Sequence, residues 1–309
     1  MSIAIAVFSY NQSKYILDAL KSVATQTMEI DEFFIVDDGS SDNSQEIIHS
    51  FCSELNLHNT KVVQILDSDN CGLARRLNQV LSQSISDWVL WLAADDFLHP
   101  EAIKRLTSNL LTQDLAVVFG DYAEANEQGA PTGRLIPKDT WRSVAANGLI
   151  TPNYFYKTTL RYTNFISGGL TLLNRQSLLE VGSYEPGRSG EDLDMMLRLG
   201  KHYKAQYVNS TVGTVRIVAE SQSRNHRKHT LDYAHILGKH KSGQLVDNCL
   251  IINFVMMRWC LTLFASRGRI WVPIRKLALA DGYSIVLHIL ILPITFFYMM
   301  WHVIRERFF

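Results

Sequence analysis

The stretch Phe33-Phe34-Ile35-Val36-Asp37-Asp38-Gly39-Ser40 joins four apolar residues to a polar turn. A short, continuous apolar run that stops at turn residues is typical of a strand buried on both faces. The run from Ile3 to Phe8 has the same form and ends in the polar segment 9–12. Apolar residues recur at helical spacing from Tyr15 to Val23 between these runs, so the sequence predicts a strand–helix–strand unit.

The same alternation continues to about residue 119. Further strands are expected at 62–66, 88–92 and 115–119. The helices expected between strands are one with Ile47, Ile48, Phe51 and Leu55 on one face, one at 73–81, and one at 101–111 with Pro100 at its start. This alternation predicts an α/β fold with a mostly parallel central sheet and helices on both faces.

Polar residues follow three of the predicted strands. They are the segments 9–12 and 37–40 and the pair Asp95-Asp96. Ligands of open α/β sheets bind at the carboxyl ends of the strands. We therefore expect these three segments to meet in one crevice.

Asp95 and Asp96 come directly after a buried strand, where unpaired carboxylates are costly. Mg²⁺ and Mn²⁺ prefer carboxylate oxygens and often join one or two carboxylates to the phosphates of a substrate. The pair is therefore a candidate site for a divalent cation. Because Asp-Asp before His-Pro also suits a helix N-cap, a capping role is the alternative.

Other candidate residues have simpler alternatives. Asp38 could bind the edge of a base or a ribose hydroxyl, or form a turn with Gly39. Tyr10 could stack on a base, or be a core residue with a satisfied hydroxyl. The acidic run 190–194 precedes an apolar helix pattern, and the helix dipole favours acids there in any protein.

Charge is distributed unevenly along the chain. There are 19 acidic and 7 basic residues before Ala130, against 11 and 23 from Ala130 onward. An acidic fold domain argues against a nucleic-acid partner and favours a metal site facing a more basic half. The first apolar run has no basic region before it and is too short for a signal peptide, so a cytoplasmic location is expected.

Six motifs occur in a fixed order along this pattern. They are Val7-Phe8-Ser9-Tyr10-Asn11, Val36-Asp37-Asp38-Gly39-Ser40-Ser41-Asp42, Asn70-Cys71-Gly72-Leu73-Ala74-Arg75-Arg76-Leu77-Asn78, Leu92-Ala93-Ala94-Asp95-Asp96, Ser167-Gly168-Gly169, and Glu191-Asp192-Leu193-Asp194 with Arg198. Together they resemble the inverting glycosyltransferases of family 2, over roughly residues 2–220. The resemblance implies a GT-A fold, which is Rossmann-like.

The resemblance also implies roles for individual residues. Phe8 and Tyr10 would line the pocket for the base of a nucleotide-diphosphate sugar donor, and Asp38 would bind that base. Asp95 and Asp96 would hold the ribose and the metal. On the acceptor side, Asp192 would be the catalytic base, with Glu191 and Gly169 near the acceptor. Ala93 stands where many members have the first acid of Asp-x-Asp.

Two adjacent arginines follow Gly72. Arg75 is a candidate for the donor diphosphate, and Arg76 shares its position after the glycine. The alternative for both is an arginine that faces solvent. Arg216 is a further candidate of the same kind.

These observations predict a metal-dependent inverting glycosyltransferase that acts on a saccharide or lipid-linked acceptor in surface polysaccharide or glycolipid synthesis. A nucleotidyltransferase is a weaker alternative, because the segment 9–12 lacks the Gly-rich, basic loop it would need. A non-catalytic GT-A-like binding protein is the other, although the acidic motifs are all present.

The chain is expected to have two regions. Residues 1–225 would form the catalytic domain, with a nucleotide-binding half at about 1–125 and an acceptor half at 126–225. Residues 226–309 would form a C-terminal helical extension on the inner face of the cytoplasmic membrane. The alternative is that its apolar runs are core helices that pack on the catalytic domain or on a second subunit. The segment Tyr283–Ile304 contains no Asp, Glu, Lys or Arg and is long enough to span a bilayer, whereas Leu245–Ala265 is interrupted by Asp247 and Arg258.

Overall fold

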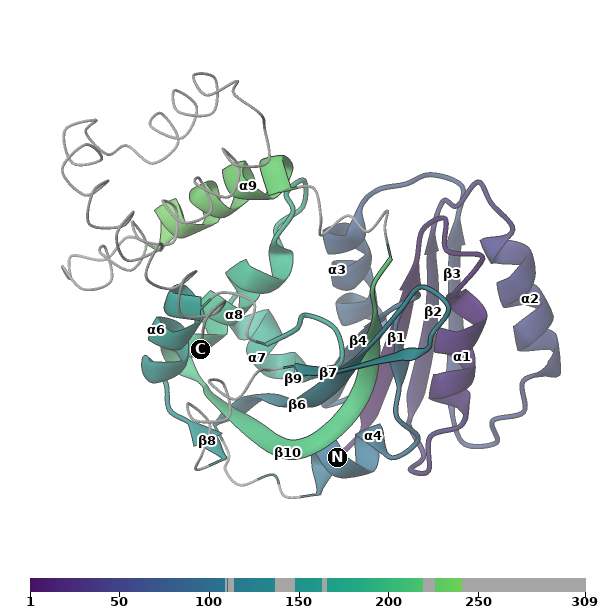
Figure 1. The fold of residues 1–309 in the computed structure, drawn as a ribbon, viewed down its shortest axis with the longest axis horizontal. Coiled ribbons are helices and arrows are strands. Elements are labelled where there is room, and N and C mark those ends of the chain that lie inside the picture. The colour runs from purple at the N-terminus through teal and green to yellow at the C-terminus, as the bar shows by residue number, and fades with distance from the viewer. Residues whose placement is uncertain (109, 111–113, 137–147, 163–165, 219–225, 241–309) are drawn as a thin grey trace.

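The computed structural model describes residues 1–108, 110, 114–136, 148–162, 166–218 and 226–240. These residues form one mixed sheet covered by helices on both faces (Figure 1). The strand order is β3-β2-β1-β4-β9-β6-β10-β5, with β7 paired to β6 and β8 to β10. The predicted α/β class, with a parallel sheet at its centre, is confirmed.

The first half of the chain supplies the parallel part of the sheet. Its strands are β1 (Ile3–Ser9), β2 (Glu32–Asp38), β3 (Lys61–Asp67) and β4 (Trp88–Ala93), and its helices are α1 (Ile16–Ala24), α2 (Ser44–Glu54) and α3 (Leu73–Gln83). Strand β1 pairs in parallel with both β2 and β4, and β2 with β3. Each of these elements lies where the apolar pattern places it.

The second half adds one long parallel ladder and several antiparallel pairs to the sheet. Its strands are β5 (Phe97–Leu98), β6 (Leu115–Ala125), β7 (Pro131–Ile136), β8 (Leu149–Ile150), β9 (Leu172–Asn174) and β10 (Lys204–Arg216). Its helices are α4 (Ala102–Thr107), α6 (Tyr154–Tyr162), α7 (Arg175–Glu180), α8 (Glu191–His202) and α9 (His226–Lys239). Strand β9 is antiparallel to both β4 and β6, so it joins the two halves.

Two expected element boundaries differ from the structure. Helix α4 begins at Ala102 and ends at Thr107, so it is shorter than the predicted 101–111. Strand β6 continues beyond Phe119 to Ala125, because its ladder with β10 runs on past the polar residue Asp121. The hydroxyl of Tyr207 donates to Asp121 Oδ1 at 2.8 Å, which satisfies that buried carboxylate.

The core lies on both sides of the sheet. On β1, Ile3, Ile5 and Val7 pack on the face covered by α1, α2 and α4, whereas Ala4 and Ala6 pack on the face covered by α3, α7 and α8. Neighbouring residues of a strand point to opposite faces, so a continuous apolar run is needed to fill both layers. This explains the continuous apolar runs of β1, from Ile3 to Phe8, and of β2, from Phe33 to Val36.

No helix in the described part of the chain is long and apolar enough to cross a bilayer. Both apolar runs of the expected extension, Leu245–Ala265 and Tyr283–Ile304, lie outside the described residues. Helix α9 is the described beginning of that extension, and it packs against α8.

Candidate active site

The polar ends of β1, β2 and β4 lie side by side. In the sheet register, Ser9 is opposite Asp37, and Phe8 is opposite Ala93. The backbone N–H of Ala94 donates to the carbonyl of Phe8 at 2.9 Å, which carries the contact past the end of β4. The three segments therefore meet at one edge of the sheet, as their positions after parallel strands predict.

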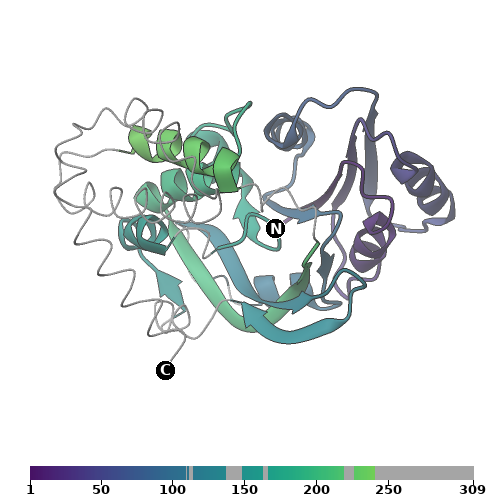
Figure 2. The ribbon, with the colours of Figure 1, turned by 45° about the horizontal axis from the view of Figure 1, so that its top comes forward.

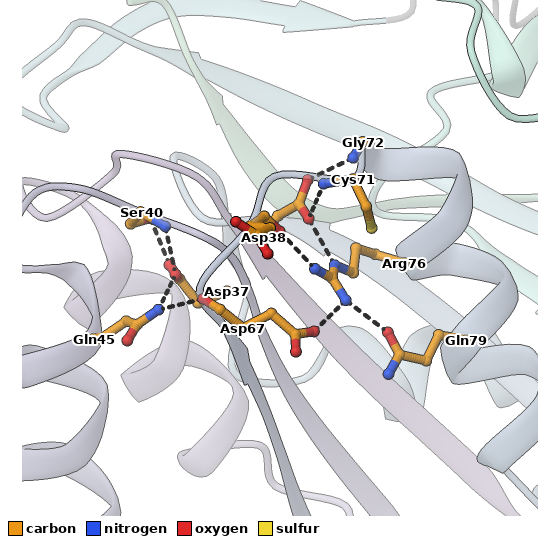
Figure 3. Close-up of polar contacts among 10 residues, drawn as sticks. Asp37, Asp38, Ser40, Gln45, Asp67, Cys71, Gly72, Arg76 and Gln79 are labelled. Atoms are coloured by element: carbon orange, nitrogen blue, oxygen red, sulfur yellow. Dashed lines mark hydrogen bonds and ion pairs between the residues drawn. The ribbon is translucent and has the colours of Figure 1, made fainter.

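Asp38 is held by the loop that begins α3 (Figure 3). Its carboxylate accepts from the backbone N–H groups of Cys71 at 2.9 Å and Gly72 at 2.8 Å, and from Arg76 Nε at 2.6 Å. Burial alone would raise the pKa of Asp38, but these hydrogen bonds favour the carboxylate and bring the pKa below its usual value. The carboxylate therefore links the end of β2 rigidly to α3.

Arg76 is buried, so the expectation that it faces solvent is wrong. Besides Asp38, its guanidinium pairs with Asp67 and donates to Gln79 Oε1 at 3.0 Å and to the carbonyl of Asp69 at 3.0 Å. Its neighbour Arg75 is exposed. The two arginines therefore have different roles, and that of Arg76 is structural.

We expect Arg76→Met to lower the free energy of unfolding by about 3–5 kcal/mol, because it leaves the buried Asp38 carboxylate without its ion-pair partner. Arg75→Met is the matched control, with an expected change within about 0.5 kcal/mol since that side chain is exposed. Urea denaturation of the two variants measures both values. Equal urea midpoints would show that the Asp38–Arg76 pair does not stabilise the fold.

Asp95 and Asp96 are half-buried in the turn between β4 and β5. Burial and the neighbouring Asp95 carboxylate raise the pKa of Asp96 to about 8, and burial raises the pKa of Asp95. The backbone N–H of Arg216 donates to Asp96 Oδ1 at 3.0 Å. Helix α4 has Glu101 as its N-cap, so the pair does not cap that helix.

The Arg216 side chain is engaged in contacts within the protein, so it is not available to bind the diphosphate of a sugar donor. Its guanidinium pairs with Asp18 at 2.8 Å and lies over the rings of Tyr15 and Phe97, at 4.8 and 5.6 Å from their centroids. It is almost fully buried. Arg216 therefore fixes the backbone that orients Asp96.

Asp95 and Asp96 offer carboxylate oxygens, the ligand atoms that Mg²⁺ and Mn²⁺ prefer. Two carboxylates held close together repel each other, and burial increases that cost, so a cation between them would stabilise the ionised pair. Within the described ranges, no group of three or more His, Cys, Asp or Glu residues is placed to hold a metal ion. A bound diphosphate would have to supply the remaining oxygens.

Glu191 and Asp192 form the first turn of α8. Asp192 lies against the segment 167–169: a Cβ on Gly168 would be 2.7 Å from the Cβ of Asp192. Burial, and then the charge of Asp192, raise the pKa of Glu191 to about 7. Gly168 thus makes room for the acid, a role that the sequence pattern alone assigned to no residue.

The charges of Asp96 and Asp192 both act on the same tyrosine. Burial, and then the charges of Asp96 and Asp192, raise the pKa of Tyr122 to about 12. Electrostatic interactions of this kind require proximity. Acids that are 96 positions apart in the chain therefore act on one tyrosine of β6.

The aromatic candidates at the end of β1 differ in exposure. Phe8 is half-buried and meets Trp91 edge to face, with ring centroids 5.8 Å apart. Tyr10 is 41% exposed, so the expectation that it is a core residue is wrong and its ring is available for stacking. Gly169 lies beside the carbonyl of Trp91, which accepts from the N–H of Leu170 at 3.1 Å.

Sequence patterns missed Trp91, Tyr184 and Tyr122. Trp91 Nε1 donates to the Tyr184 hydroxyl at 2.8 Å, and both side chains are buried. A polar atom on each ring is a weak signal, because a buried tryptophan or tyrosine needs a hydrogen-bond partner in any core. For these residues, only the tertiary structure distinguishes site from core.

We expect Glu191→Gln to raise Tm at pH 8 but not at pH 4. The folded protein keeps a proton on Glu191 up to about pH 7, whereas the unfolded chain releases it near 4.5, so unfolding free energy falls as pH rises between these values. The amide of the Gln variant does not ionise, so its unfolding free energy does not decrease over this pH range for that reason. Glu54→Gln, at an exposed position of α2, should show no such pH-dependent gain, and an equal gain in both variants would contradict the assignment.

The chain is similar to several glycosyltransferases. It is 26% identical over 225 residues to glycosyltransferase GlyA of Streptococcus pneumoniae, which covers 72% of this chain and 31% of the relative. It is 29% identical over 171 residues to the poly(ribitol-phosphate) beta-N-acetylglucosaminyltransferase TarS of Staphylococcus aureus, which covers 54% of this chain and 29% of TarS. The chain thus spans less than half the length of these relatives.

Solved structures share the fold. The crystal structure of Staphylococcus aureus TarS residues 1–349 with UDP-GlcNAc superposes with a TM-score of 0.60 at 18% identity, over 87% of this chain and 74% of that one. A mannosyltransferase from Pyrobaculum calidifontis, in complex with GDP-Man and Mn²⁺, gives 0.61 at 14% identity, over 91% and 79%. The expected GT-A fold is confirmed.

A match between the sequence and a family model identifies the family. The family model described as glycosyl transferase family 2 matches residues 4–182, more than half of the chain. That range includes the end of β1, the Asp38 loop, the Asp95-Asp96 turn and the segment 167–169. The chain therefore belongs to glycosyltransferase family 2.

Proposed function

We propose that this glycosyltransferase is metal-dependent and inverting, and that it moves a sugar from a nucleotide-diphosphate sugar to an acceptor hydroxyl. The observation that carries the proposal is geometric: Asp192 lies against Gly168, and the adjacent Gly169-Leu170 backbone is hydrogen-bonded to Trp91 of β4, the strand that leads into the Asp95-Asp96 turn. The Asp95-Asp96 pair suits a cation and a diphosphate, and Asp192 suits the acceptor. A transfer with inversion needs these two functions on opposite sides of the sugar.

On the donor side, Phe8 and Tyr10 would line the base pocket. Asp38 already accepts three hydrogen bonds, but carboxylate oxygens have about four lone-pair sites, so it retains capacity for the base. Asp95 and Asp96 would hold the ribose and a divalent cation, Mg²⁺ or Mn²⁺. Arg75, exposed on the first turn of α3, would add positive charge near the diphosphate.

On the acceptor side, Asp192 would take the proton of the attacking hydroxyl, with Glu191 and Gly169 beside the acceptor. When bound, the cation would neutralise the charge that develops on the leaving nucleotide diphosphate. The absence of a side chain at Gly168 leaves room for Asp192, whose Oδ1 accepts from the backbone N–H of Leu193 at 2.7 Å. A general base must be within hydrogen-bond reach of the proton it removes.

The donor class is supported by the ligands of the related structures. TarS was solved with UDP-GlcNAc and the Pyrobaculum enzyme with GDP-Man and Mn²⁺. Family 2 membership favours this function over a nucleotidyltransferase or a non-catalytic binding protein. We further propose a saccharide or lipid-linked acceptor in surface polysaccharide synthesis. The name of the relative TarS, a poly(ribitol-phosphate) beta-N-acetylglucosaminyltransferase, supports a polymeric acceptor.

A panel of nucleotide diphosphates, each with Mn²⁺ or with EDTA, tests the proposal by thermal shift. A ligand at about 100 times its Kd adds roughly 2.7 kcal/mol to the unfolding free energy, which gives a shift of several degrees. We expect one nucleotide diphosphate of the panel to raise the Tm, and to do so with Mn²⁺ but not with EDTA. Transfer from the matching sugar donor should give the opposite anomer by NMR, whereas retention of configuration would contradict the mechanism.

We also propose that residues 226–309 bring the enzyme to the inner face of the cytoplasmic membrane. The support is the apolar segment Tyr283–Ile304 together with the basic residues Arg267, Arg269, Arg275 and Lys276, which suit anionic head groups. In fractionated cells, we expect the full chain in the membrane fraction and a chain ending at Lys239 in the soluble fraction. A full-length protein that stays soluble at low salt would contradict this.

A further inference from the structure

Helix α9 lies across the beginning of α8, the helix that carries Glu191 and Asp192 (Figures 1 and 2). Residues 188 and 189, directly before α8, are bonded to α9. Asp232 of α9 accepts from the backbone N–H of Ser189 at 3.1 Å and from the Ser189 hydroxyl, and it pairs with Arg188 at 3.9 Å. The turn that precedes Glu191 and Asp192 is thus attached to a helix from the C-terminal part of the chain.

The next residue, Gly190, is held by packing. It is the N-cap of α8 and has a φ of +91°, a left-handed conformation that favours glycine. A Cβ here would clash with the ring of Tyr233, which is buried on α9, and would lie 3.1 Å from Ile236 Cδ1. The ring of Tyr233 therefore occupies the space beside Gly190 and fixes the entry into α8.

The other side of the acidic turn is also tied to this part of the chain. Asp194 is buried and accepts from Arg198 Nε at 2.9 Å, and its Oδ1 lies 3.4 Å from His240 Nε2. The carbonyl of His240, directly after α9, accepts from the Tyr156 hydroxyl at 3.0 Å. Contacts from residues 232–240 thus lie on both sides of Glu191 and Asp192.

We propose that Tyr233 and Asp232 of α9 are positioning residues for Asp192. This inference rests on the proposed role of Asp192 as the base. Neither side chain reaches the reacting atoms: they act by fixing Ser189 and Gly190, so that α8 begins with its first-turn acids in the crevice. A displacement of about 1 Å can cost about 100-fold in rate, so a packed turn matters even at a distance.

The test compares three variants of the full chain. Tyr233→Ala opens the space beside Gly190, and we expect kcat to fall by about 10- to 100-fold while the affinity for the nucleotide diphosphate with Mn²⁺ stays within about 2-fold. Tyr233→Phe keeps the ring and should restore kcat to near the wild-type value. Lys239→Ala, which removes only a half-exposed ion pair with Glu185 at the end of the same helix, should leave both values unchanged.

Asp232→Ala provides an independent measurement if Tyr233→Ala folds poorly. It removes the acceptor for Ser189 and should lower kcat several-fold, again without loss of nucleotide affinity. A Tyr233→Ala or Asp232→Ala enzyme with wild-type kcat would overturn the inference, and so would a parallel loss of kcat and nucleotide affinity. A wild-type chain that transfers no sugar would instead refute the proposed function.

Discussion

Asp192→Asn should reduce transfer by about 100- to 10,000-fold, the contribution of a positioned general base. The amide has nearly the same shape, so its packing against Gly168 is kept. It cannot accept the proton of the acceptor hydroxyl, however. Because the proposed role of Asp192 concerns the acceptor, affinity for the nucleotide diphosphate with Mn²⁺ should remain close to the wild-type value. Initial rates at saturating donor and acceptor measure the first value, and calorimetric titration measures the second.

Glu191→Gln is the matched control for that experiment, because Glu191 is the adjacent acid in the same helical turn. The comparison is informative because the pKa of Glu191, raised by burial and by Asp192 to about 7, would also suit a general base. We expect the Gln variant to lose less activity, through weaker acceptor binding. If Glu191→Gln is the nearly inactive variant and Asp192→Asn is active, the two roles must be exchanged.

The first four strands could be predicted from the sequence because each is a short, mostly apolar run bounded by polar residues. The runs of β1, β2 and β4 are buried on both faces, whereas only one residue of β3, at the edge of the sheet, is buried. Strand β9 could not be predicted, since three residues, Leu172–Asn174, give no usable period. It pairs with β4 and β6 in antiparallel orientation, which only tertiary contacts determine. The sequence also ended β6 too early, because Asp121 looks like a strand end until its bond from Tyr207 is known.

Within the site, the residues after parallel strands were predictable, and their partners were not. Arg76 is an instructive case: it lies one turn before Val80 on the buried face of α3, so helical spacing could have separated it from Arg75. The combined effect of Asp96 and Asp192 on the pKa of Tyr122 has no such signal. It depends on how β6 and α8 pack, which a linear pattern does not contain.

Asp96→Ala should weaken Mn²⁺ binding in the presence of the nucleotide diphosphate by about 100-fold or more, if this carboxylate is a direct metal ligand. Loss of a residue that only orients a metal ligand typically costs about 10- to 100-fold in metal affinity, so loss of a direct ligand should cost at least as much as the upper value. Structure favours Asp96 over Asp95 for this role, because the N–H of Arg216 fixes its carboxylate at 3.0 Å. Calorimetric titration of Mn²⁺ measures the effect.

Asp95→Ala separates the two acids. If Asp95 mainly holds the ribose, its loss should weaken nucleotide binding with and without Mn²⁺ by a similar factor, whereas loss of Asp96 should act only when Mn²⁺ is present. Removing either carboxylate also relieves the repulsion between them, so the unliganded variants should be no less stable than the wild type. A lower Tm in both unliganded variants would indicate that the pair is structural. Unchanged Mn²⁺ affinity in Asp96→Ala would place the metal on other oxygens.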